Sequence, residues 1–323
     1  MRQPLISIVG TTATGKTAVA LELAQAAIAA KKYARVHLIS ADSRQVYSEL
    51  AILSGADVPD DFTAASDPNF SFPFFQNQEK TIILHGVSML AATDEWSVAL
   101  FREFALKILR TALGANELVI IVGGTGLYHA HLMQLDPALM IPPDPIWRAE
   151  ALTLSIESLH EVLKALDAKK LENLNHSDKN NPRRLQRAIE VARTTPIALP
   201  EWQVTTIAGY TQQYFGLSIS REALAERIQL RVQKRLEQKV LSEVTAYFLT
   251  YGELDLPSAS TLGLKELWAY QQGEISREVA LEKWTTAEVQ YARRQAVWWK
   301  KQPGMHWLDS TLAAAQILES ITE

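Results

Sequence analysis

Eight consecutive residues near the start of the chain have the types and spacing needed to bind a phosphorylated ligand. They fill every fixed position of the G-x-x-x-x-G-K-[ST] pattern: Gly10, Thr11, Thr12, Ala13, Thr14, Gly15, Lys16 and Thr17. The glycines permit backbone torsions that direct N–H groups at phosphate oxygens. Lys16 adds a positive charge, and the Thr17 hydroxyl suits Mg²⁺. A glycine turn without a ligand is the alternative. The complete pattern favours a phosphate cradle, although it does not identify the reaction.

A carboxylate at Asp42 could face the same ligand. It follows an apolar strand predicted for residues 36–40, and ligands of open α/β sheets gather beyond the carboxyl ends of strands. Three interpretations are open: a helix N-cap, a magnesium ligand and a general base. Spacing alone ranks them in that order.

A second glycine turn, residues 123–126, follows the clearest buried strand of the chain, residues 117–122. Within it, the Thr125 hydroxyl could satisfy backbone groups of the turn or point into the same crevice. A nucleotide hydrolase usually places a magnesium aspartate at the end of such a strand. Since no carboxylate stands there, the sequence disfavours a motor or switch protein.

Two later segments concentrate positive charge. One is the start of a predicted helix, which carries Arg183, Arg184 and Arg187. These arginines could form a solvated basic face, or they could contact the phosphates of a nucleic acid. Arg227 and Arg231 share one face of a second helix, predicted over residues 221–247, together with Arg235. That row would suit anions, or salt bridges to the nearby acidic residues Glu222, Glu226 and Glu237.

The remaining pattern shows how these residues are positioned. Strands are predicted at residues 5–9, 36–40, 81–84 and 117–122, and helices at 17–30 and 97–113, so we expect a parallel sheet with right-handed crossovers. Residues 55–80 are broken by prolines and predict an irregular flap, pinned to the body by phenylalanines. Prolines after residue 135 indicate the start of a smaller, helical lobe. Near the carboxyl end, Trp298 and Trp299 are expected either to pack in the core or to stack on bases.

Composition limits the class of protein. The chain has 323 residues, 47% of them hydrophobic, no cysteine and a formal net charge of −4. A disulfide, a thiolate zinc site and a thiol nucleophile are therefore excluded, and a protein that coats nucleic acid nonspecifically is disfavoured. No apolar run has membrane-spanning length and no signal pattern precedes the first strand, so we expect a cytoplasmic protein that does not bind membranes.

Taken together, the motifs resemble those of the tRNA dimethylallyltransferase (tRNA isopentenyltransferase) family. The matching segments occur in the family's order and span nearly the whole chain: residues 10–17, 41–47, 122–128, 182–191, 227–232, 262–266 and 290–299. The resemblance implies a P-loop NTPase-like α/β fold, a parallel sheet with helices on both faces, plus a smaller helical insertion domain. It divides the chain into a first part of the catalytic core (1–135), a helical tRNA-binding insertion (136–205) and a second part of the core with carboxyl-terminal helices (206–323).

The resemblance also implies a reaction. A dimethylallyl group passes from dimethylallyl diphosphate to N6 of adenosine 37 of tRNA, with Mg²⁺ on Thr17 and a monomeric enzyme expected. Asp42 becomes the proton acceptor, in preference to the N-cap. The cradle holds the diphosphate with Arg231 or Arg227, and Thr125 aligns the diphosphate or the target. The positions that match tRNA contacts of the family are Asp42, Ser43, Arg44, Gln45, Arg148, Arg183, Arg184, Leu185, Gln186 and Arg187.

Two departures from the family pattern lie outside the cradle and Asp42. The family commonly has Gly-Thr-Ala-Lys-Pro after the aspartate motif, whereas residues 54–59 read Ser-Gly-Ala-Asp-Val-Pro and lack the lysine. Of a histidine-containing segment, only His85-Gly86-Val87-Ser88 survives. The alternatives are a P-loop small-molecule kinase, an isopentenyltransferase for free adenine nucleotides and a noncatalytic RNA-binding protein. The first two would have no use for the basic segment at residues 183–187.

Overall fold

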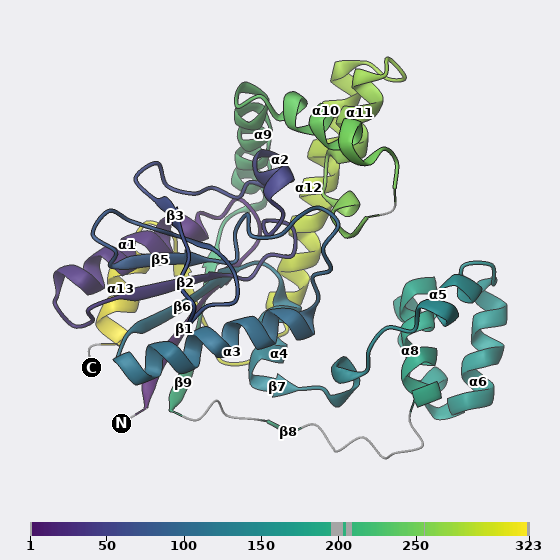
Figure 1. Ribbon diagram of the computed structural model, residues 1–323, viewed down its shortest axis with the longest axis horizontal. Coiled ribbons are helices and arrows are strands. Elements are labelled where there is room, and N and C mark those ends of the chain that lie inside the picture. Colours follow the sequence, from purple (N-terminus) through teal and green to yellow (C-terminus); the bar gives the residue numbers. More distant parts are fainter. Residues whose placement is uncertain (1, 195–202, 205–208, 255, 322–323) are drawn as a thin grey trace. The chain divides into compact units, whose positions relative to one another are not determined.

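The chain forms two compact units in the computed structural model, which describes residues 2–194, 203–204, 209–254 and 256–321 (Figure 1). One unit comprises Met1–Leu132 and Thr206–Glu323, and the other comprises Met133–Thr205. The smaller unit is thus an insertion between two parts of the larger one.

The larger unit is built on an eight-stranded sheet with the order β10-β9-β1-β6-β2-β5-β4-β3. Six strands are parallel: β1 (Gln3–Gly10), β2 (Val36–Ser40), β5 (Ile82–His85), β6 (Leu118–Gly123), β9 (Tyr210–Ser218) and β10 (Met305–Asp309). In the centre, Ile8 of β1 lies opposite Val122 of β6, so both strands end at the same edge. The predicted parallel sheet is confirmed.

Helices cover the two faces of this sheet because its strands are apolar on both sides. Ile6 and Ile8 of β1 and Ile120 of β6 share one core with buried residues of α1 (Lys16–Ala29) and α13 (Ala313–Ser320). The amphipathic helix α3 (Val98–Ala115), capped by Ser97, crosses the sheet in Figure 1. The α/β layers expected from the alternating strands and helices are therefore present.

The segment 55–80 is more regular than its prolines suggested. It contributes β3 (Thr63–Ala65) and β4 (Phe74–Gln76), which extend the sheet as an antiparallel edge through pairing of β4 with β5. The expectation that phenylalanines pin this segment is confirmed. The Phe70 ring lies 4.8 Å from the His85 ring, and Phe72 contacts the rings of Trp96 and Phe104.

The helix predicted over residues 221–247 is divided in two. It forms α9 (Arg221–Glu237) and α10 (Val240–Tyr251), separated where Lys239 adopts a left-handed backbone with φ of 69°. With α2 (Ala51–Ser54), α11 (Leu264–Gln271) and α12 (Arg277–Trp299), they enclose a second core around Val244 and Trp284. Ser276 caps α12, because its hydroxyl accepts the backbone N–H of Val279.

The smaller unit is mainly helical. Its two short strands, β7 (Gln134–Leu135) and β8 (Gln203–Val204), pair antiparallel. Between them in the chain lie four helices: α5 (Pro145–Ala151), α6 (Ile156–Asn173), α7 (His176–Lys179) and α8 (Pro182–Thr194). Trp147, Leu159, Leu163, Leu185 and Ile189 form its core.

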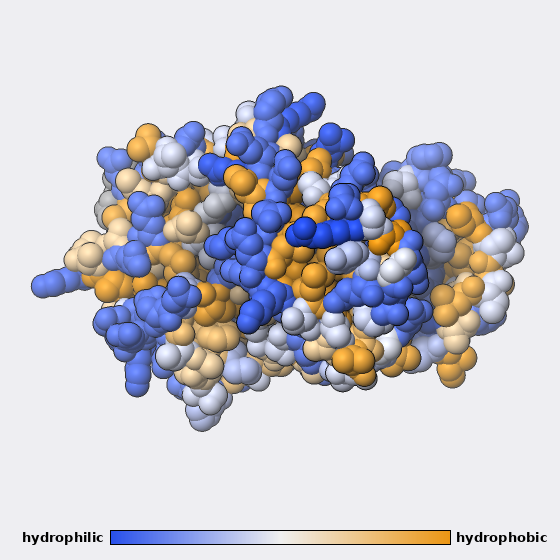
Figure 2. Space-filling model, turned by 90° about the horizontal axis from the view of Figure 1, so that it is seen from above, coloured by the Kyte–Doolittle hydropathy of each residue, from blue (hydrophilic) through white to orange (hydrophobic). Residues whose placement is uncertain are grey.

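Hydrophilic and hydrophobic residues are interspersed on the face of the molecule shown in Figure 2. Within the described part of the chain, no helix combines the length and apolarity required to cross a bilayer.

Candidate active site

The predicted phosphate cradle joins the end of β1 to the start of α1. Gly10 and Gly15 have φ of 148° and 86°, and Ala13 between them also has positive φ, 62°. A Cβ on Gly10 would lie 3.0 Å from the carbonyl oxygen of Leu217, so only glycine fits there without movement. The loop therefore has the left-handed turns that present backbone N–H groups to an anion.

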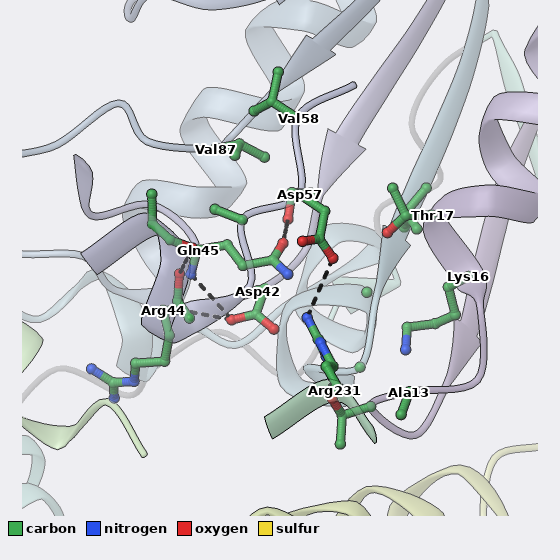
Figure 3. A pocket seen from close by; sticks show the side chains of 18 of the residues that line it. Ala13, Lys16, Thr17, Asp42, Arg44, Gln45, Asp57, Val58, Val87 and Arg231 are labelled. Carbon is green, nitrogen blue, oxygen red and sulfur yellow. Dashed lines mark hydrogen bonds and ion pairs between the residues drawn. The ribbon is translucent and has the colours of Figure 1, made fainter. Parts of the chain in front are cut away.

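The cradle opens on a cavity of about 1180 Å³ in the larger unit. Lys16 and Thr17 line it from α1, Asp42 from the end of β2, and Arg231 from α9 (Figure 3). Residues as far apart in the chain as Lys16 and Arg231 thus line one cavity, and the common direction of β1, β2 and β6 brings the cradle and Asp42 to the same edge of the sheet.

Lys16 is half-buried beside other charges. Its ammonium donates to the carbonyl oxygen of Thr11 at 2.6 Å. Burial, and then the guanidinium of Arg231, lower the pKa of Lys16 to about 8, while Asp42 acts in the opposite direction. A bound anion would raise this pKa and so keep the ammonium charged to higher pH.

Asp42 faces this cavity from a turn, which excludes one of its three interpretations. Its Oδ1 accepts hydrogen bonds from the backbone N–H groups of Arg44 at 2.8 Å and Gln45 at 3.4 Å. The next helical element is the short 3-10 helix Ser48–Leu50, which begins after Tyr47. The helix N-cap is therefore wrong, because the carboxylate caps a turn. The sheet directs that carboxylate to the cavity, between Gln45 and Arg231 (Figure 3).

The structure separates the two candidate arginines. Arg231 donates to Oγ1 of Thr12 at 2.8 Å and to the carbonyl oxygen of Gly55 at 3.2 Å, and it lies 3.7 Å from Asp57. Gly55 has φ of 67°, and a Cβ there would collide with the guanidinium. Arg227 lines the same cavity but is exposed. Arg231 is thus the arginine that contacts the cradle.

Arg235, the third of that row, is buried against α12. It donates to Glu288 at 2.8 Å, and burial followed by the charge of Arg231 lowers the pKa of Arg235 to about 10. The sequence suggested Glu222, Glu226 and Glu237 as salt-bridge partners of this row. In the structure, Arg231 pairs with Asp57 and Arg235 pairs with Glu288 instead.

Sequence reasoning missed three polar residues of α12 that line the cavity: Glu288, Tyr291 and Gln295. Gln295 accepts the backbone N–H of Thr12 at 2.7 Å, which ties the helix to the cradle. Burial, and then Asp42, raise the pKa of Tyr291 to about 12, and the side chains of Thr125 and Gln295 act against this rise. The signal was available, since residues 288, 291 and 295 repeat at helical spacing on one face.

The second glycine turn lies beside this helix. Thr125 donates its backbone N–H to the carbonyl oxygen of Ala41 at 3.3 Å, which links the turn to the chain just before Asp42. The indole of Trp298, 37% exposed, occupies the space where Gly126 has no Cβ. Trp299 is buried against the ring of His129, so packing in the core is confirmed for it.

The predicted tRNA contacts next to Asp42 have partners within the larger unit. Arg44 donates to the carbonyl oxygen of Pro257 at 2.7 Å. Gln45 donates to the carbonyl oxygen of Gly55 at 2.9 Å, and Ser43, which precedes these two residues, is half-buried.

In the smaller unit, the predicted contacts surround Glu190, which is 2% exposed. Arg148 and Arg187 donate to it at 2.7 and 2.9 Å. Burial would raise the pKa of Glu190, but these hydrogen bonds hold it below its usual value. Arg187 also donates to two backbone carbonyl groups. Both arginines therefore brace the helical unit.

The other four positions on α8 differ in accessibility. Leu185 has no exposed surface, because its side chain packs in the helical core, so this position offers no side chain to a ligand. Arg183 is exposed, and Arg184 is exposed with an ion pair to Asp178. Gln186 donates to the carbonyl oxygen of Arg148 at 3.2 Å.

Comparison with known proteins identifies relatives along the whole chain. Residues 75–302 match the family model described as IPP transferase, and residues 3–66 match that of isopentenyl transferase. A tRNA dimethylallyltransferase of Gloeobacter violaceus is 32% identical over 98% of this chain and 95% of that protein. A tRNA dimethylallyltransferase of Oleidesulfovibrio alaskensis is 29% identical over 97% of this chain and 95% of that protein.

Solved structures agree with these matches. The crystal structure of a tRNA isopentenylpyrophosphate transferase from Bacillus halodurans is 25% identical, with a TM-score of 0.65 over 99% of this chain and 96% of that one. A eukaryotic dimethylallyltransferase, crystallised acting on tRNA, shares the fold with a TM-score of 0.72, at 21% identity over 95% of this chain and 74% of that one.

Proposed function

Because the chain belongs to the IPP transferase family, we propose that it transfers a dimethylallyl group from dimethylallyl diphosphate to N6 of adenosine 37 of tRNA. The product is N6-isopentenyladenosine, next to the anticodon on its 3′ side. The observation that carries this proposal is a single cavity in which a phosphate cradle and Arg231 face the carboxylate of Asp42. We further propose that the protein acts as a monomer in the cytoplasm.

The reaction needs opposite groups on its two sides. The N6 nitrogen forms a bond to C1 of the dimethylallyl group, and the bond from C1 to the diphosphate oxygen breaks. Pyrophosphate leaves with the electron pair, so the cradle N–H groups, Lys16 and Arg231 stabilise the charge that develops on it. Asp42 accepts the proton lost from N6, a poor nucleophile in its neutral amine form.

The residues present suit a magnesium ion. Thr17 stands at the first turn of α1, beside Lys16, and its hydroxyl lines the cavity opposite the carboxylate of Asp42. Oxygen ligands of this kind are those Mg²⁺ prefers, with the remainder supplied by phosphates and water. Thr17 would hold the ion, which neutralises charge on the diphosphate when bound.

Recognition of tRNA is assigned to both units. Since the target base must leave its stack to reach N6, side chains beside Asp42 have to hold it, and we assign this to Ser43, Arg44 and Gln45. Thr125 helps to align the reacting groups. Phosphate contacts are assigned to polar side chains of the smaller unit: Arg148, Arg183, Arg184, Gln186 and Arg187.

One assay separates this function from its alternatives. The protein is incubated with labelled dimethylallyl diphosphate, Mg²⁺ and one of three acceptors: unmodified tRNA, AMP, or a panel of small molecules with ATP. We expect label in tRNA alone. Label in AMP would indicate an isopentenyltransferase for free nucleotides, and phosphate transferred from ATP would indicate a kinase.

Two variants of one residue test the proton acceptor. Asp42→Asn keeps an oxygen for the N–H groups of Arg44 and Gln45 but removes the base, whereas Asp42→Ala removes both. We expect kcat to fall about 10²–10⁴-fold in each, with tRNA affinity nearly unchanged. Normal turnover by Asp42→Asn would show that the carboxylate is not the base.

A further inference from the structure

The carboxylate of Asp57 lies beside the arginine of the cradle. Its Oδ2 is 3.7 Å from the guanidinium of Arg231, the contact drawn as a dashed line in Figure 3. Gly55, two residues earlier, accepts hydrogen bonds from both Arg231 and Gln45. The backbone that carries Asp57 is thus held next to the anion-binding groups by two hydrogen bonds.

The charges around Arg231 make this pair significant. Arg231 is close enough to Lys16 for its charge to help lower the pKa of that lysine. Arg235 is balanced by the buried Glu288. Among the described residues, the ion pair formed by Arg231 itself is the one with Asp57. The carboxylate of Asp57 therefore lies beside a guanidinium that a diphosphate in the cradle would also contact.

We propose that Asp57 competes with the diphosphate for Arg231, and so weakens binding of both the donor and the pyrophosphate product. This inference rests on the function proposed above. When a diphosphate enters, Arg231 exchanges a carboxylate for phosphate oxygens, and the free energy of the lost pair reduces the affinity. The same exchange in reverse assists release of pyrophosphate. Asp57 touches neither reacting atom, so it is a positioning residue.

The size of the effect follows from exposure. The side chain of Asp57 is 68% exposed and that of Arg231 is 25% exposed, so water and salt screen the pair. Exposed ion pairs of this kind change equilibrium constants by about two- to five-fold. We expect Asp57→Asn to tighten pyrophosphate binding by that factor at low salt, and by less in about 0.5 M salt.

Calorimetric titration of the full chain with inorganic pyrophosphate and Mg²⁺ tests this. Asp60 provides the matched control, because it lines the same cavity and is exposed, yet forms none of the ion pairs found among the described residues. Asp60→Asn removes the same charge, so it measures the general effect of lowering the negative potential. Combining Asp57→Asn with Arg231→Gln completes a double-mutant cycle.

The proposal requires tighter binding by Asp57→Asn, a change below about 1.5-fold in Asp60→Asn, and loss of the Asp57→Asn effect when Arg231 is replaced. Equal effects of the two Asn variants, no effect of Asp57→Asn, or an effect that persists without Arg231 would each overturn it. Failure of pyrophosphate to bind the unaltered protein is a different result, since it would refute the cradle and the proposed transfer reaction with it.

Discussion

At the scale of single residues, the half-buried ammonium of Lys16 makes anion binding depend on pH. Its pKa of about 8 means that a rise in pH through this value removes the charge from the free protein. Diphosphate binding favours the charged form and therefore weakens above about pH 8. The effect on folding stability has the opposite sign. The unfolded chain retains this proton up to the ordinary pKa of 10.5, so the cost of holding Lys16 charged in the folded chain disappears, and stability rises, between about pH 8 and that value.

We expect the affinity for pyrophosphate to be constant below about pH 7.5 and to fall between about pH 8 and 9.5. Calorimetry across this range measures it. Pyrophosphate also titrates, so the unaltered protein is compared with Lys16→Arg, whose guanidinium stays charged throughout. The ratio of the two affinities isolates the lysine, and a ratio that stays constant from about pH 7 to 9.5 would contradict its depressed pKa.

Lys16 and Thr17 could be assigned from the sequence because a phosphate loop fixes both the residue spacing and the backbone path. Asp42 could be placed near them only by the rule for strand ends, and its turn with Arg44 depends on local geometry that no spacing encodes. The choice of Arg231 over Arg227 depends on Gly55, whose missing side chain leaves room for one guanidinium.

At the scale of elements, α12 holds the candidate site together. Glu288 binds α9 through Arg235, and Gln295 binds the cradle through Thr12. Its start is locally specified, because Ser276 is a residue type favoured as an N-cap. The partners of its inner face could not be found in the same way, because they lie far away in the chain and are chosen by tertiary packing.

Gln295→Leu tests the connection between helix and cradle. The substitution leaves the N–H of Thr12 without the oxygen it now donates to, and Gln295 itself is only 6% exposed. We expect a loss of about 1–3 kcal/mol in the free energy of unfolding, measured in urea, and weaker pyrophosphate binding. Gln290→Leu, on an exposed position of the same helix, should change neither quantity; equal stability of the two variants would mean that the hydrogen bond contributes little.

Other elements show where local patterns lose to tertiary structure. The prolines of residues 55–80 indicated an irregular segment, but the free edge of β5 recruits Phe74–Gln76 as a strand. The break between α9 and α10 at Lys239 carries neither proline nor glycine, so the helical pattern ran through it unmarked.

At the scale of the whole molecule, a net charge of −4 leaves tRNA binding to local groups of cations. The sequence located such a group on α8, but its helical unit uses much of that charge internally. Arg148 and Arg187 neutralise the buried Glu190, and Arg184 pairs with Asp178. Side chains with internal partners and side chains available to a ligand look alike in a sequence, since both are arginines at the start of a helix.

Arg183 is exposed on this helix and offers the cleanest test of the phosphate contacts. If it neutralises one tRNA phosphate, Arg183→Gln should weaken tRNA binding and reduce the slope of log affinity against log salt concentration by about 0.7–0.9. Filter binding between about 50 and 300 mM salt measures both quantities. The rate at saturating tRNA should not change, because Arg183 belongs to the smaller unit and the cavity to the larger one.

Arg187→Gln is the contrasting variant on the same helix. It removes hydrogen bonds to Glu190 and to two carbonyl groups, so we expect it to destabilise the helical unit as well as to weaken binding. Thermal unfolding distinguishes the two variants, since only Arg187→Gln should lower the melting temperature. An unchanged salt slope in Arg183→Gln would exclude this arginine from the tRNA contacts. A lower rate at saturating tRNA would show that α8 influences the transfer step as well as the affinity for tRNA.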